Sequence, residues 1–336
     1  MRRPYSGRAC LVLLLLALAQ VDPLAVAATA SAADELPAWA YVVSASVAPA
    51  TPMVGAPAAA DTRPRHVPGS PRTFRPDQIL DRFSAPDWHP DGHAPMPAAV
   101  ATGRRPEVYA CGYCHLPNGQ GRPENASLAG LPAAYIVGQV RDFRAGRRQS
   151  SDPRHVPTAL MVQVAAKVSD EDLEVAARYF AGLERRAWIR VVEADRIART
   201  RVGGFMLVPS GEPGTEPIGT RIVEMPVDVE RTELRDDASG FVAYVPKGSL
   251  AKGERLVISG GGITVPCAGC HGVGLHGLGP APPLAGRSPS YLVRQLYDLK
   301  RGTRHGTGAA LMQPTVARLA LTDMIAIAAY AASLPP

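Results

Sequence analysis

The sequence predicts a mainly α-helical protein made of two copies of one helical unit, joined by a β-rich segment and preceded by a proline- and alanine-rich extension. Three observations predict this organisation. The second half of the chain repeats the order of the first, apolar residues recur at helical spacing within each copy, and the composition changes before and between the copies. We expect the extension at 34–96, the two units at 97–185 and 247–336, and the β-rich segment at 186–246.

The internal repeat has a defined register. A shift of 156 residues pairs the following positions: Cys111, Cys114 and His115 with Cys267, Cys270 and His271; 128–130 with 284–286; Tyr135, Gln139 and Gly146 with Tyr291, Gln295 and Gly302. After that glycine the offset is 151, and it pairs Met161 with Met312 and Tyr179 with Tyr330. The first copy therefore contains five extra residues between Gly146 and Met161.

Each copy contains the pattern of a helical unit. Residues 135–143 and 291–299 carry apolar side chains three and four positions apart, which is typical of an amphipathic helix. The closing helix of the first copy has Ser169 as its N-cap and Asp172 at the reciprocal capping-box position. We expect its buried stripe, and that of the second copy, at these residues: Leu173, Ala176, Ala177 and Phe180, and Ile325, Ala328, Ala329 and Ala332.

The first 33 residues are typical of an export signal. Three arginines precede an unbroken apolar run at 9–19, which is too short to span a bilayer, and alanines at 30, 32 and 33 offer cleavage sites. An uncleaved anchor is the alternative, because residues 21–28 could lengthen the apolar run. Cys10 leaves with a cleaved signal, and four cysteines remain.

The charge of the chain does not favour a nucleic-acid partner. Cleavage removes three arginines and one aspartate, so the formal net charge falls from +6 to +4. The remaining basic residues are mostly arginines scattered along the chain, whereas binding to a phosphate backbone needs dense clusters.

The four remaining cysteines stand in two motifs, CGYCH at 111–115 and CAGCH at 267–271. This is the pattern of covalent haem attachment, in which each thiol adds to one haem vinyl group and the histidine coordinates the iron. A redox-active cysteine pair or a zinc site would not explain an adjoining histidine placed identically twice. We therefore expect two covalently attached haem c groups, bound through Cys111, Cys114, Cys267 and Cys270, with His115 and His271 as iron ligands.

The repeated methionines, Met161 and Met312, are candidates for the sixth iron ligand. A single methionine in such a place is more often core packing, but these two keep the same register to the haem motifs. A thioether can complete the coordination of haem iron, and His/Met ligation raises its potential. His155 is the alternative ligand in the first copy, and we expect it near the surface because Pro153 and Pro157 flank it in the inserted loop.

On these motifs, the chain resembles the tandem dihaem c-type cytochromes, which are built from two class I cytochrome c domains. The resemblance covers about residues 97–183 and 249–334 and includes the LAG loops and the tyrosine helices. It implies two cytochrome c-like helical haem domains. It also implies that a proline carbonyl orients each motif histidine, a role that fits Pro280, whereas Pro123 is one position out of register.

The remaining segments are less informative. Within the extension, residues 44–76 are typical of a poorly ordered tether, while Trp88 is available to pack on the first unit. His89 and His93 could bind a metal, although histidines among prolines are more often ordinary surface residues. Short β-rich runs bounded by glycine and proline fill 186–246, as a linker or as a docking surface.

We predict a periplasmic electron carrier with no catalytic residue of its own. Its expected partners are redox proteins, namely a dehydrogenase, a quinol-oxidising complex or a terminal oxidase, and it could meet the membrane through such a partner. Two other functions stay open: a dihaem cytochrome c peroxidase, which needs one open iron site, and the haem subunit of a larger dehydrogenase. A dihaem thiosulfate-oxidising enzyme would use a further cysteine as ligand, and none is spare after Cys10 is removed.

Overall fold

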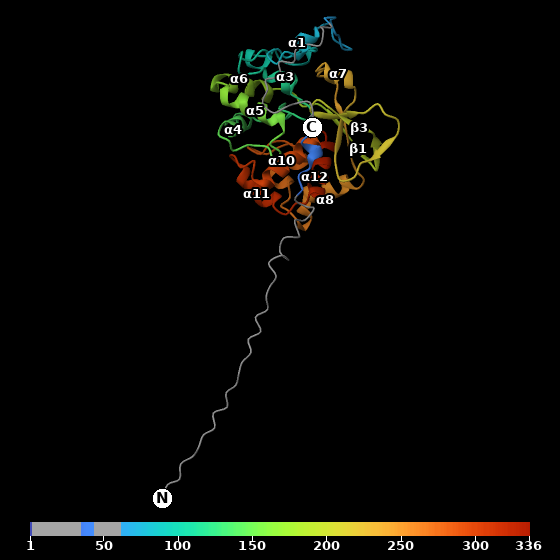
Figure 1. Ribbon diagram of the computed structural model, residues 1–336. Coiled ribbons are helices and arrows are strands. Elements are labelled where there is room, and N and C mark those ends of the chain that lie inside the picture. The colour runs from blue at the N-terminus through green and yellow to red at the C-terminus, as the bar shows by residue number, and fades with distance from the viewer. Residues whose placement is uncertain (2–34, 44–61) are drawn as a thin grey trace. The chain divides into compact units, whose positions relative to one another are not determined.

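The computed structural model describes residues 1, 35–43 and 62–336. The predicted signal at 1–33 and most of the predicted tether therefore lie outside the described residues. Residues 36–336 form one compact unit, in which helices surround two haem motifs and strands gather on one side (Figure 1). None of the helices in the described part of the chain is long and apolar enough to cross a membrane.

The first helical unit follows the predicted order. Its helices are α2 (Ala98–Ala101), α3 (Cys111–His115), α4 (Ala133–Arg144), α5 (Val156–Lys167) and α6 (Asp170–Ala181). The Ser169 hydroxyl accepts a hydrogen bond from the Asp172 backbone N–H, which confirms the predicted N-cap. The Asp172 carboxylate instead accepts from Arg104, at 2.8 Å and 2.9 Å. The predicted stripe of α6 is buried at all four positions.

The second helical unit has the same elements with a longer first helix. Its elements are α8 (Ser249–Ser259), the 3-10 turn η5 (Gly260–Gly262), α9 (Ala268–His271), η6 (Val273–Leu275), α10 (Pro289–Arg301), α11 (Ala309–Val316) and α12 (Leu321–Ser333). Helix α12 is buried nearly all round, since it packs against both α8 and α10 and forms the centre of the largest apolar core.

The repeat is present in the backbone hydrogen bonds. The Leu128 N–H donates to the Gly119 carbonyl, and the Leu284 N–H donates to the Leu275 carbonyl, 156 residues later in each case. Past the change of offset, the Gly130 N–H donates to Phe180, and its equivalent Gly286 donates to Ala331. These bonds join the loop after each haem motif to each closing helix, so the two units share one internal frame.

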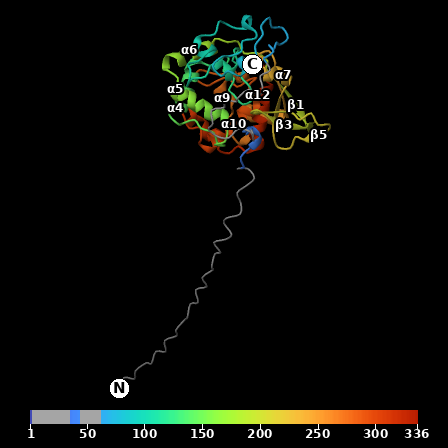
Figure 2. The ribbon, with the colours of Figure 1, turned by 45° about the horizontal axis from the view of Figure 1, so that its top comes forward.

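Residues 189–246 hold the strands and one short helix. These are β1 (Ile189–Ala194), β2 (Arg196–Ala198), β3 (Thr200–Gly203), β4 (Met206–Pro209), β5 (Thr215–Pro217), β6 (Val223–Pro226), α7 (Val229–Glu233) and β7 (Phe241–Pro246). In the three-stranded sheet β7 lies between β1, which is parallel, and β6, which is antiparallel. β2 pairs with β5 and β3 pairs with β4, and the turned view of Figure 2 shows these strands beside the second unit.

The extension is folded where the structure describes it, at 35–43 and from residue 62. The short turn η3 (Ala38–Ala40) leads to Tyr41, which is buried and donates to Asp298 Oδ1 at 2.6 Å. Val67 packs with Trp88 ahead of and behind helix α1 (Pro76–Leu80), so the prediction of a poorly ordered tether is wrong for 62–76. Trp88 packs against Leu234 of the β-rich segment rather than on the first helical unit.

The crossing of α8 and α12 requires a glycine. A Cβ atom at Gly253 would lie 2.0 Å from the Ala326 carbonyl oxygen, which belongs to the helix backbone and cannot rotate away. We expect Gly253→Ala to lower the free energy of unfolding by about 1–3 kcal/mol, the cost of overpacking a core. The matched control is Gly138→Ala on α4, where a Cβ meets no atom within 4 Å. Urea unfolding followed by circular dichroism measures both, and an equal effect of the two variants would contradict the packing.

Candidate functional site

The cysteines of each motif lie on one short helix. Cys111 and Cys114 are one turn apart on α3, and Cys267 and Cys270 stand at the same spacing at α9, so each pair presents its thiols on one face. All four are free thiols. Burial raises the pKa of the Cys111 thiol to about 12 and that of Cys267 to about 11. A redox-active pair needs a thiolate at neutral pH, so these environments disfavour it.

Each motif histidine is oriented by a backbone carbonyl. His115 Nδ1 lies 2.8 Å from the Ala126 oxygen, and His271 Nδ1 lies 2.8 Å from the Pro282 oxygen, eleven residues after the histidine in both units. The Nδ1 atom must carry the proton to donate, which leaves Nε2 with a lone pair. Burial lowers the pKa of both rings and keeps them neutral. This is the tautomer that a metal-binding histidine needs, and the residues therefore fit a haem iron.

The identity of the orienting carbonyl corrects the sequence analysis. Pro280 was expected to supply it in the second unit, and the contact belongs to Pro282 instead. In the first unit Ala126 takes this role, and Pro123 makes no such bond. Ala126 and Pro282 are 156 residues apart, so the contact follows the repeat although the residue type does not. A backbone carbonyl can be supplied by any residue, which is why the sequence pattern pointed to the wrong position.

The methionines lie on equivalent helices and are partly buried. Met161 on α5 packs on the core formed by Val108, Val140, Ala165, Val168 and Leu173. Met312 on α11 packs on the same apolar core as Cys267. In the first unit, Cys111 belongs to a neighbouring cluster, and Val137 of α4 joins that cluster to the one that holds Met161.

His155 is buried, so its predicted place near the surface is wrong. Only 3% of the residue is exposed, and its ring packs edge-on against Tyr41 with 5.7 Å between the centroids. Its Nδ1 lies 2.8 Å from the Thr158 hydroxyl. Burial, with Arg294 nearby, lowers the pKa of His155 to about 3. The histidine thus packs against residues of the second unit and of the extension.

Two arginines that the sequence analysis missed join the units. Arg148 donates to Gln139, and across the interface to Tyr291 and Gln295, at 2.7–3.0 Å. Arg304 mirrors it and donates to Gln295, and across the interface to Tyr135 and Gln139, at 2.8–3.2 Å. The two arginines are 156 residues apart and pair as a short antiparallel bridge. The repeat register already related them, and extending it by two residues past Gly146 would have found the pair.

Further arginines of the second unit hold the loop of the first haem motif. Arg287 donates to the carbonyl oxygens of Ser127 at 2.7 Å and Ala129 at 3.1 Å, on either side of Ala126. Arg294 donates to the Pro123 carbonyl at 2.6 Å. Burial lowers the pKa of Arg287 to about 10, which leaves it charged at neutral pH. The orienting carbonyl of His115 is therefore fixed by residues of the other unit.

Comparison with known proteins agrees with this arrangement: the chain belongs to the dihaem c-type cytochromes, which carry two covalently bound haem c groups and transfer electrons. It is 41% identical over 68 residues to cytochrome c-554(548) of Halomonas halodenitrificans, covering 82% of that protein and 20% of this chain. It is 27% identical over 236 residues to the thiosulfate dehydrogenase electron acceptor of Thiomonas intermedia, 68% of this chain and 81% of the relative.

A second long relative is cytochrome c4 of Pseudomonas aeruginosa, with 26% identity over 238 residues, 69% of this chain and 88% of the relative. No family model matches the chain. Among solved structures, reduced recombinant cytochrome c4 from Pseudomonas stutzeri has 21% identity and a TM-score of 0.43, over 67% of this chain and 93% of that one.

The buried His155 predicts a pH dependence of stability. Its pKa is about 3 when folded against 6.5 ordinarily, so below pH 6.5 the unfolded chain takes up a proton that the folded chain does not. Stability from this residue is complete above that pH and is lost as the pH falls, by about 1.4 kcal/mol per unit. Urea unfolding at pH 7 and pH 5 should show a smaller loss in His155→Asn than in the wild type. The exposed His305→Asn is the control, and an unchanged slope in His155→Asn would contradict the assignment.

Proposed function

We propose that this chain is an exported, periplasmic electron carrier with two His/Met-ligated haems. The first haem is attached through Cys111 and Cys114, and the second through Cys267 and Cys270. Their irons take the following ligands: His115 and Met161 in the first unit, and His271 and Met312 in the second. Residues 97–185 and 247–336 act as the two haem domains in this proposal.

The observation that carries the proposal is the paired orientation of the two histidines. Each ring is neutral, has its proton on Nδ1 and leaves Nε2 available, at the same place relative to two thiols. An unused ring nitrogen on a buried histidine, found twice at one repeat offset, is the arrangement of a metal ligand. When bound, the haem groups supply one-electron iron chemistry, and the chain contributes attachment, ligation and burial.

The cross-unit arginines support transfer between the two sites inside one molecule. Arg148 and Arg304 are buried or nearly so and make three hydrogen bonds each, two of them to the opposite unit. Hydrogen bonds from charged donors are stronger than neutral ones, so the interface resists relative movement of the units. A fixed interface keeps the separation of the two haem sites constant.

The redox partners follow from the relatives. One relative is named as the electron acceptor of thiosulfate dehydrogenase, and we infer a dehydrogenase as the donor to this chain. A quinol-oxidising complex or a terminal oxidase then completes the route. Export through residues 1–33 would place the chain in the periplasm.

Substitution of the proposed sixth ligands tests the site. We expect Met161→Ala to remove about half of the weak red charge-transfer band of the ferric protein and to lower the potential of one haem, because a thioether ligand raises it. Met312→Ala should do the same for the other haem. His155→Asn is the matched control and should leave the band intact. If His155→Asn changes the band and Met161→Ala does not, the first haem has two histidine ligands.

Peroxide turnover tests the carrier against the peroxidase alternative. With methionine closing both irons, we expect negligible turnover in the fully oxidised and the half-reduced protein, measured with a small electron donor. Met161→Ala, which opens one iron, should raise the rate and shows that the assay can detect it. Robust turnover by the unmodified protein would instead indicate an enzyme.

A further inference from the structure

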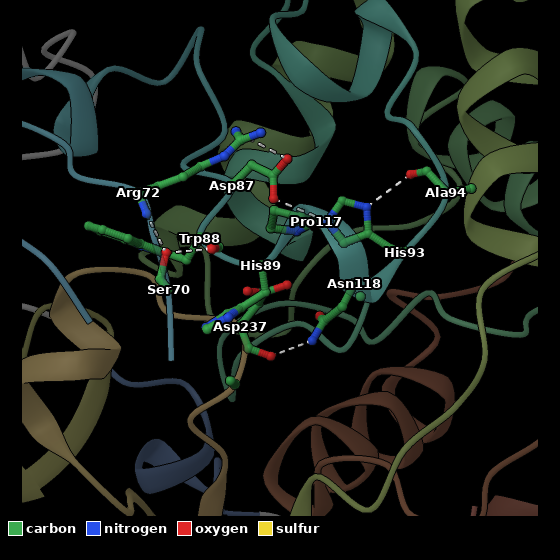
Figure 3. A network of polar contacts seen from close by, with 12 residues as sticks. Ser70, Arg72, Asp87, Trp88, His89, His93, Ala94, Pro117, Asn118 and Asp237 are labelled. Atoms are coloured by element: carbon green, nitrogen blue, oxygen red, sulfur yellow. Dashed lines mark hydrogen bonds and ion pairs between the residues drawn. The ribbon is translucent and has the colours of Figure 1, made fainter. Parts of the chain in front are cut away.

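A cluster of potential metal ligands lies outside the haem sites. It consists of His89, at the start of the 3-10 turn η4 (Pro90–Gly92), with Asp236 and Asp237 between α7 and β7. One ring nitrogen of the histidine and one oxygen of each carboxylate lie within 4.8 Å of one another. Figure 3 shows His89 beside Asp237, with Asn118 below them. Residues 147 positions apart in the chain are thus brought together.

Asp237 lacks the partners that a buried carboxylate needs. Only 5% of the residue is exposed, and its Oδ1 has no hydrogen-bond partner among the described residues. The bond to Asn118 Nδ2, at 2.5 Å, is made by the backbone oxygen of Asp237 and not by its side chain. Burial raises the pKa of Asp237 to about 6, so the group is still largely ionised at neutral pH. A buried charge without a partner is costly and calls for an ion or a water that satisfies it.

The other two groups complete a mixed donor set. Asp236 Oδ2 accepts from Arg231 at 2.6 Å, while Oδ1 accepts from the Ala238 N–H and lies 2.9 Å from His89 Nε2. The carboxylate is held in place by these bonds. The side chain of His89 is 21% exposed, which leaves a way in from solvent.

His93, the other histidine of the extension, is engaged elsewhere. Its Nε2 lies 3.3 Å from Asp87, and its Nδ1 lies 2.9 Å from the Ala94 oxygen and 3.1 Å from the Tyr179 hydroxyl (Figure 3). The two histidines that the sequence placed together therefore do not form one site.

We propose that His89, Asp236 and Asp237 bind one divalent transition-metal cation, for which Zn²⁺ is the best fit. Imidazole nitrogen together with carboxylate oxygens suits Zn²⁺, whereas Ca²⁺ and Mg²⁺ prefer oxygen ligands alone. Three protein ligands leave a fourth position of the tetrahedron to water. In the bound form His89 Nε2 presents its lone pair to the cation in place of the contact with Asp236.

The cation would fasten three segments around the first haem motif. His89 follows Trp88, whose indole N–H donates to the Leu234 carbonyl at 2.8 Å. Arg235, next to the two aspartates, lies 3.6 Å from the centre of the Tyr113 ring and donates to the Tyr113 carbonyl at 2.7 Å. Tyr113 stands between the two cysteines of the first motif. The site is thus structural, and it clamps the extension and the β-rich segment over helix α3.

Zinc binding by the haem-loaded protein tests the proposal. After treatment with a chelator, the protein is dialysed against Zn²⁺, and its zinc is measured against haem iron by mass spectrometry of the elements. We expect one zinc for every two irons. We expect His89→Ala and Asp237→Asn to weaken binding at least tenfold, and His93→Gln, the matched control, to bind as the wild type does.

Thermal unfolding separates loss of a ligand from loss of the fold. Zn²⁺ should raise the Tm of the wild type and of His93→Gln, because it binds only the folded state. Asp237→Asn removes a buried charge and should fold with an equal or higher Tm that no longer responds to Zn²⁺. No bound zinc, or equal binding by His89→Ala and Asp237→Asn, would overturn the site and leave a histidine–aspartate ion pair.

Discussion

The hydrogen bond from each motif histidine to a carbonyl eleven residues later is the constraint on which the rest of the structure depends. It fixes the tautomer and the direction of the ring, and a loop must hold its carbonyl in place for the bond to form. In each unit that loop is tied to the closing helix by a further backbone bond, from Gly130 or Gly286. The helices around the motif are therefore arranged to position one acceptor atom, and the packing of α4 and α6, or of α10 and α12, follows from this.

The two units depend on one another through buried arginines. Arg287 holds the loop that contains the acceptor for His115, and the pair Arg148 and Arg304 exchanges hydrogen bonds across the interface. Burying a guanidinium is costly unless all sides are satisfied, and here carbonyl, amide and phenol oxygens from the other unit do so. Separation of the units would leave these groups without partners. The arrangement explains why residues 36–336 form one compact unit although the sequence contains two copies.

The repeat does not extend to what surrounds each attachment helix. Around α3, Arg235 lies over Tyr113, and Trp88 binds the neighbouring backbone of the β-rich segment. Around α9, Cys270 is exposed, and Val273 on the following turn is 92% exposed. The extension and the β-rich segment have no second copy, so they can cover only one of the two motifs. The two haem sites, equal in their ligands, thus differ in their access to solvent.

The sequence by itself determined what depends on short range and on periodicity. The register of the repeat, the amphipathic helices, the Ser169 cap and the two haem motifs could all be read from residues near in the chain, because helix formation and thioether spacing are local properties. The tertiary structure decided what long-range contacts control. It placed His155 in the interior against Tyr41, gave the orienting role to Ala126 and Pro282, and brought His89 to Asp237. Backbone acceptors carry no signature in the side-chain sequence, and burial depends on distant segments, so only the folded chain reveals them.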